Sequence, residues 1–215
     1  MLSIIETMAL HGLDGYLVEV QVDVSPGMPN WDVVGLPDAS VKEAKERVRT
    51  AIRNSGFEFQ SRKIVVNLAP ANTKKEGSLF DLPIAVGILM NFGYIKRQFF
   101  NKTIFVGELS LDGKINKAKG ILPICIEAKK MGIRRIILPR ENSKEAAIVN
   151  SLEVIGVSTL DELVQYLNGE IIIEKTKTNI DELWNKEQEY DVDFSEVKGQ
   201  ENVKRAIEVA AARQS

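Results

Sequence analysis

Short apolar segments alternate with amphipathic segments along the second half of the chain, and this order constrains the fold more than any other feature. The segments typical of strands are residues 103–115, 134–139 and 152–157. The segments typical of helices are residues 120–132, 141–150 and 158–169. Successive strands separated by a helix run parallel, because the crossover returns the chain to the same end of the sheet. The second half therefore predicts a parallel part of a sheet.

The first half follows a different pattern. Residues 15–24, "GYLVEVQVDV", alternate apolar and polar side chains, as a half-buried strand does. Residues 31–36 are typical of a second strand and, with the turn "SPGMPN" between the two, predict a hairpin. Residues 63–70 predict a short buried strand that ends at Pro70. Antiparallel pairing here and parallel pairing later predict a mixed sheet and an α/β (α+β) fold.

A helix is predicted over residues 38–56. Ser40 and Glu43 have the spacing of a capping box, and Gly56 stands where a C-terminal glycine ends a helix. The apolar residues at helical spacing are Val41, Ala44, Val48, Ala51 and Ile52. The cations of an adjacent face are Lys42, Lys45, Arg49 and Arg53.

These four cations have two interpretations. They can lie along nucleic-acid phosphates, and Lys74 and Lys75 of a later loop extend the patch if the fold brings them close. They can also form a solvated face paired with neighbouring acids such as Glu43 and Glu46, which is the commoner role of a charge run. The formal net charge is −2, so any nucleic-acid contact depends on a local patch. The six lysines and arginines remain candidate contacts.

Composition excludes several classes of site. One histidine, His11, and one cysteine, Cys125, are too few for a structural zinc site, and no internal disulfide can form. His11 beside Gly12 is expected in a turn, and Cys125 is expected to be a core thiol. The longest apolar run, near residues 82–90, is far shorter than the roughly 20 residues of a membrane helix. Without a secretory signal pattern, a cytoplasmic protein with no membrane contact is expected.

The segment "GELSLDGK", residues 107–114, resembles a phosphate-binding loop only superficially. It has five residues between its glycines where the motif requires four, and Ile115 replaces the Ser or Thr that binds magnesium. Asp112 and Gly113 instead predict the turn of a hairpin.

Ser78 lies in a lysine-rich loop, residues 71–78, ahead of an apolar helix that begins near Asp81. One hypothesis is a serine–lysine hydrolase, with Lys75 or Lys119 as the base. A serine hydroxyl is a weak nucleophile without a base, and a lysine base must be desolvated to lower its pKa. A polar loop instead predicts exposed, charged amines. Ser78 is therefore expected to be a helix-entry residue or a cap.

Three long stretches, residues 9–59, 64–89 and 105–115, together resemble the ComM/YifB family of magnesium-chelatase-like AAA+ proteins. The resemblance implies a domain like the proteolytic domain of Lon, with a fold shared with GHMP kinases and a ribosomal protein. It implies a Lon-like domain over residues 1–170 and the start of an ATPase module over residues 191–215. The strongly charged, weakly apolar composition of residues 171–190 predicts a linker between them. An amphipathic helix is predicted from about Gln200. ATP and magnesium are then expected only in a full-length protein, which would act as a hexamer in DNA branch migration during natural transformation.

The resemblance to Lon also bears on Ser78. Lon carries K-D-G-P-S-A-G around its nucleophile, and aligning Glu76 and Gly77 with the acid and first glycine puts Leu79 at the serine. Counting from the hairpin puts Leu122 at the position of the catalytic lysine. A non-catalytic domain is implied. A serine–lysine peptidase with a shifted dyad remains an alternative, and a GHMP-type kinase ranks last because the loop has one glycine.

Overall fold

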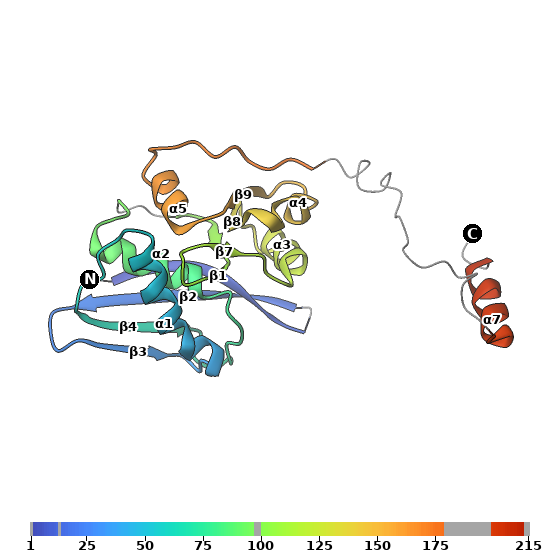
Figure 1. Ribbon diagram of the computed structural model, residues 1–215, viewed down its shortest axis with the longest axis horizontal. Helices are drawn as coiled ribbons and strands as arrows, with labels where there is room; N and C mark the ends of the chain where they lie inside the picture. Colours follow the sequence, from blue (N-terminus) through green and yellow to red (C-terminus); the bar gives the residue numbers. More distant parts are fainter. Residues whose placement is uncertain (1, 13, 97–99, 179–198, 213–215) are drawn as a thin grey trace. The chain divides into compact units, whose positions relative to one another are not determined.

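The computed structural model describes residues 2–12, 14–96, 100–178 and 199–212, and the chain divides into two compact units, Met1–Thr178 and Asn179–Ser215 (Figure 1). Residues 179–198 carry much of the predicted linker and lie outside the described residues. The predicted boundaries at 170 and 190 stay predictions.

The first unit is built on a seven-stranded sheet. The strands are β1 (Leu2–His11), β2 (Asp14–Ser25), β3 (Asn30–Val34), β4 (Lys63–Ala69), β5 (Thr103–Phe105), β8 (Arg135–Pro139) and β9 (Glu153–Val157). Their order is β3-β4-β2-β1-β5-β8-β9. The β1–β2 and β2–β4 pairs are antiparallel, and the other four pairs are parallel. The mixed sheet and the parallel second half are confirmed.

The predicted hairpin between residues 15–24 and 31–36 is wrong. Strand β4 lies between β2 and β3, and β3 pairs with β4 in parallel, with Trp31 opposite Ile64. The hairpin partner of β2 is β1, which the sequence pattern did not predict and which pairs from Leu2↔Asp23 to His11↔Asp14. Alternation identifies a strand but not its neighbour, because pairing partners are chosen by the tertiary structure. His11 is the exposed last residue of β1, not part of the turn itself.

Helices cover both faces of the sheet. They are α1 (Ala39–Asn54), α2 (Asp81–Phe92), α3 (Ile121–Lys130), α4 (Ser143–Ala146) and α5 (Leu160–Leu167), with a 3₁₀ turn at Arg140–Asn142. Neighbouring residues of β8 belong to two different apolar clusters, one on each face of the sheet. Ile137 belongs to the cluster that contains residues of α1, α2 and α5, and Ile136 to the cluster that contains residues of α3 and α4. Cys125 belongs to the second cluster, as predicted, and burial raises the pKa of its thiol to about 12.

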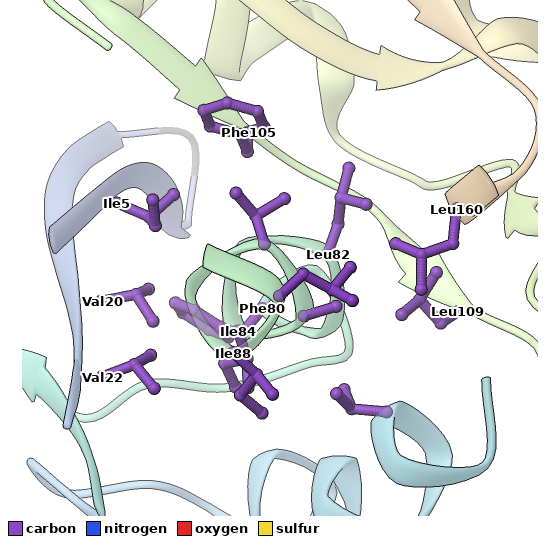
Figure 2. Packing of buried hydrophobic residues seen from close by; sticks show 14 of the residues in the cluster. Ile5, Val20, Val22, Phe80, Leu82, Ile84, Ile88, Phe105, Leu109 and Leu160 are labelled. Atoms are coloured by element: carbon purple, nitrogen blue, oxygen red, sulfur yellow. The ribbon is translucent and has the colours of Figure 1, made fainter. Parts of the chain in front are cut away.

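Helix α2 is the centre of the larger cluster. Every residue from Asp81 to Leu89 is buried, which explains the apolar run of this segment. Figure 2 shows Ile84 and Ile88 of this helix in the cluster that also contains Val20 and Val22 of β2. Gly87 permits the close approach, because a Cβ there would lie 2.6 Å from a methyl group of Val22.

Helix α1 has the buried face that its periodicity predicts. Its cap differs from the prediction: Asp38, not Ser40, is the N-cap, and its Oδ1 accepts a 2.8 Å hydrogen bond from the Val41 N–H. The Ser40 hydroxyl donates to the same carboxylate at 2.9 Å. A carboxylate at this position also interacts favourably with the helix dipole, so Asp38 is the stronger cap.

The segment that resembles a phosphate-binding loop forms the predicted hairpin, with β6 (Glu108–Leu109) paired to β7 (Ile115–Asn116). Gly113 occupies the turn with φ +84°. In the second unit, α7 (Glu201–Ala212) confirms the helix predicted from about Gln200. None of the helices described has the length and apolar character needed to cross a membrane.

Candidate functional site

Ser78 lies just before α2, and its hydroxyl is committed to a carboxylate. The Ser78 Oγ donates a hydrogen bond to Glu108 of β6, and the Ser78 carbonyl accepts one from the Asp81 N–H at 3.1 Å. Ser78 is thus a helix-entry residue, but it does not cap α2, whose N-cap is Phe80 and which has no side-chain cap. A carboxylate is a poor base for a serine, because a carboxylic acid is a far stronger acid than an aliphatic hydroxyl.

Lys75 contradicts the expectation of an exposed amine. Its side chain is fully buried, and its Nζ donates to the Pro70 carbonyl and, at 2.7 Å, to the Thr73 carbonyl. Burial lowers the pKa of this amine. Its role as a phosphate contact is therefore corrected, because a buried ammonium that holds its own loop cannot reach a ligand on the surface. Lys74 is exposed and pairs with Glu76 at 2.7 Å.

No hydrogen bond among the described residues joins Ser78 to a lysine. Lys119 is exposed, so it lacks the desolvation that a lysine base needs. Leu79 and Leu122, the positions aligned with the Lon dyad, both pack against the apolar cluster that contains Met8 and Val106. The two reactive positions thus contribute to core packing.

An ion pair with a buried carboxylate fixes the segment that carries Ser78. The Arg47 guanidinium of α1 donates from Nε and Nη2 to the Asp81 carboxylate at 2.8 and 3.1 Å. Asp81 is fully buried and also accepts the Leu109 N–H at 3.2 Å. Burial raises the pKa of Asp81, and the hydrogen bonds from Arg47 and Leu109 oppose that rise. The sequence analysis missed this pair, although an acid followed by a long apolar run was a usable signal.

The four predicted cations of α1 divide into two groups. Lys45, Arg49 and Arg53 line a groove of about 950 Å³, whereas Lys42 lies outside it. The segment after α1 also lines the groove and adds Arg62 and the rings of Phe57 and Phe59. The start of β3 contributes Asn30 and Trp31. The sequence analysis missed these residues because the folded chain, not the helical period, brings them beside α1.

The predicted pairing of these cations with neighbouring acids holds only in part. Arg49 lies 3.5 Å from Glu46, and Arg47 lies 3.8 Å from Glu43. Lys45 and Arg53 enter no ion pair with another described residue. The part of the chain that the structure describes holds no group of three or more His, Cys, Asp and Glu side chains suited to a metal ion.

Comparison with known proteins identifies the family. The family described as Subunit ChlI of Mg-chelatase matches residues 20–142, more than half of the chain. Competence protein ComM of Haemophilus influenzae is 37% identical over 214 residues, which cover 99% of this chain and 42% of that protein. Uncharacterized protein YifB of Escherichia coli is 37% identical over 211 residues, 98% of this chain and 41% of that protein. The chain belongs to the ComM/YifB family of magnesium-chelatase-like AAA+ proteins.

Within the ComM/YifB family, this chain spans about two fifths of the length of the relatives it matches. A more distant similarity joins it to a Lon protease of Azorhizobium caulinodans, 25% identical over 176 residues that cover 76% of this chain and 20% of that protein. The similarity to Lon that the sequence suggests is therefore confirmed, and the α/β architecture agrees with it.

Proposed function

We propose that this chain supplies the non-catalytic, Lon-like domain of a ComM/YifB-type AAA+ ATPase, supporting ring assembly and DNA engagement. The full-length protein would be a hexameric branch-migration helicase in natural transformation. Its ATP and magnesium would then be bound outside the Lon-like domain. The name of the Haemophilus relative, a competence protein, agrees with that role.

The hydrogen-bond partners of Ser78 and Lys75 are the main support for this proposal. The serine hydroxyl donates to Glu108, and the buried amine donates to two backbone carbonyls of its own loop. Acyl transfer requires a nucleophile and a base in direct contact. A scaffold of Lon type in which these groups have other partners acts by binding.

DNA engagement is supported by the α1 cations that pair with no acid in the part of the chain that the structure describes. Lys42 is exposed, Lys45 and Arg53 line the groove, and Lys74 extends the set although Glu76 partly neutralises it. Such contacts attract phosphates without regard to base sequence, and they weaken steeply as salt rises.

Titration of a labelled 20-nucleotide strand and a 20-base-pair duplex at 50 and 200 mM salt tests this proposal. Replacing Lys42, Lys45, Arg49 and Arg53 with glutamine should reduce the slope of log affinity against log salt by about 3, since each phosphate contact contributes roughly 0.7–0.9. The matched control replaces four exposed lysines elsewhere, Lys117, Lys129, Lys175 and Lys177, which the structure places in no ion pair with a described residue. Equal affinities for both variants would contradict a role of α1 in DNA contact.

One observation favours the alternative, a serine–lysine peptidase that uses Ser78 with Lys75 or Lys119. The buried Lys75 amine has a lowered pKa, which is what a lysine base requires. Hydrolysis of a peptide panel by the wild type, lost in Ser78→Ala and in either Lys75→Met or Lys119→Met, would establish this activity. Equal, null hydrolysis by the wild type and Ser78→Ala would remove it.

A further inference from the structure

We infer that the groove between α1 and residues 56–62 takes single-stranded nucleic acid, with a base stacked on the Arg49 guanidinium and phosphates at the surrounding cations. The inference rests on the proposed DNA engagement and goes further by naming the ligand class and the groove. It adds Arg62 and an aromatic platform that the helical stripe alone does not contain.

The platform is a set of packed rings beneath Arg49. Trp31 and Phe59 are stacked with ring centroids 5.7 Å apart and an interplanar angle of 16°. Phe92 supports Phe59 from the core in an edge contact at 5.3 Å. Trp31 is only 5% exposed, so this platform is held in place by the packing around it.

Arg49 lies over this platform and remains accessible. Its Cζ is 5.7 Å from the Trp31 ring centroid and 5.6 Å from that of Phe59, within the range of cation–π contact. The Arg49 side chain is 40% exposed, and among the described residues its one acidic partner is Glu46, 3.5 Å away and itself 75% exposed. Such a solvated pair is weak. The rings therefore hold in place a guanidinium that also lines the groove. Bases stack on guanidinium planes of this kind.

The charge of the groove suits a phosphate backbone. Lys45, Arg49, Arg53 and Arg62 contribute four cations, and Glu46 and Glu58 contribute two acids. The local excess of positive charge contrasts with the net charge of −2 for the whole chain. Lys45, Arg49 and Arg53 recur every four residues, so they rise about 6 Å per step along α1. The result is a row of cations beside a stacking surface.

This combination distinguishes single strands from duplexes. A duplex presents phosphates, but its base faces are stacked on one another and cannot contact a guanidinium plane. A single strand offers both phosphates and free base faces, which is why grooves that join cations to stacking platforms bind single strands. The volume of about 950 Å³ lies within the range of specific ligand sites.

The first experiment measures binding of labelled oligo(dT) and of a duplex of equal length by anisotropy, using the whole 215-residue chain. Oligo(dT) should bind more tightly, and its affinity should fall about 50-fold between 50 and 200 mM salt if four contacts form. The decisive variant is Arg49→Lys, which keeps the charge and loses the plane. It should weaken oligo(dT) binding about five-fold with an unchanged salt slope, and leave duplex binding unchanged.

A second measurement locates the bound strand. The chain has two tryptophans, and Trp184→Phe leaves Trp31 as the single indole fluorophore. Oligo(dT) bound in the groove should change Trp31 emission at the concentration that saturates anisotropy. The control variant Lys117→Gln/Lys129→Gln should give the same titration as the wild type.

The outcomes separate this inference from the proposed function. Equal affinity for single strand and duplex, with Arg49→Lys like the wild type, overturns the groove but leaves DNA engagement intact. If heparin displaces oligo(dT) and Arg49→Lys has no effect on binding, the surface is a general polyanion site, and the proposed groove for single strands is overturned. Absence of DNA binding at 50 mM salt contradicts both.

Discussion

Two fully buried ionisable side chains, Lys75 and Asp81, hold the loop and helix entry that flank Ser78. Lys75 closes its own loop through two carbonyls, and Asp81 connects α1 to β6 through Arg47 and Leu109. Burial of a charge is costly unless the charge is hydrogen-bonded, so each partner is needed. These contacts organise the backbone on both sides of Ser78.

The Arg47–Asp81 pair yields a prediction about stability. Arg47→Met should lower the free energy of unfolding by about 3–5 kcal/mol, because it leaves the Asp81 carboxylate buried without its cation. The double variant Arg47→Met/Asp81→Leu should be more stable than Arg47→Met alone. Urea unfolding of both variants and the wild type measures this. A double variant less stable than the single one would show that the carboxylate acts mainly through the Leu109 N–H.

The Asp38 cap yields a pH-dependent prediction. Partial burial acts to raise its pKa, but hydrogen bonds from the Val41 N–H, Ser40 and Gly77 hold that pKa below its ordinary value. The carboxylate therefore contributes stability above about pH 4, and this contribution is lost as the pH falls through its folded pKa. Asp38→Ala should cost about 1 kcal/mol at pH 7 and less at pH 2–3.

Thermal unfolding between pH 2 and 7 tests that cap. Asp38→Asn is the matched control, since asparagine also caps helices but does not titrate. A pH-independent difference between Asp38→Ala and the wild type would contradict the role of the charge.

At the scale of elements, the crossover β3–α1–β4 positions the groove. Gly35 directly follows β3 with φ +95°, and a Cβ there would lie 2.2 Å from the Leu68 carbonyl oxygen. Gly35→Ala should therefore cost ~3 kcal/mol, through both strain and a backbone clash. Gly56→Ala, at φ +87° with open space around it, should cost only about 1 kcal/mol. Chemical denaturation of both variants checks the difference, and similar losses would argue against the close approach.

The elements also show how far sequence reasoning reaches. The buried face of α1, the β6–β7 turn at Gly113 and the parallel strands β8 and β9 all follow from local periodicity or turn chemistry. The insertion of β4 between β2 and β3, the burial of Lys75 and the assembly of Phe59 with Arg49 do not. Each of those depends on segments distant in sequence, and local patterns carry no information about which segments meet.

The chain divides into the Lon-like unit and the unit that carries α7, each of them compact. The segment with partial similarity to a phosphate loop is a hairpin in the first unit, where it cannot cradle a triphosphate. The purified 215-residue chain should therefore show no ATP turnover above that of a heat-denatured sample. Measurable turnover in a coupled phosphate-release assay would contradict this assignment.

We expect this scaffold to bind and not to cleave, and covalent labelling of Ser78 distinguishes the two. A fluorophosphonate reacts with serines that a base has activated, and intact-mass spectrometry followed by peptide mapping reports the adduct. We expect no adduct at Ser78 beyond the level at the exposed serines of the chain. A stoichiometric adduct at Ser78 that disappears in Lys75→Met, with the fold retained, would contradict this expectation.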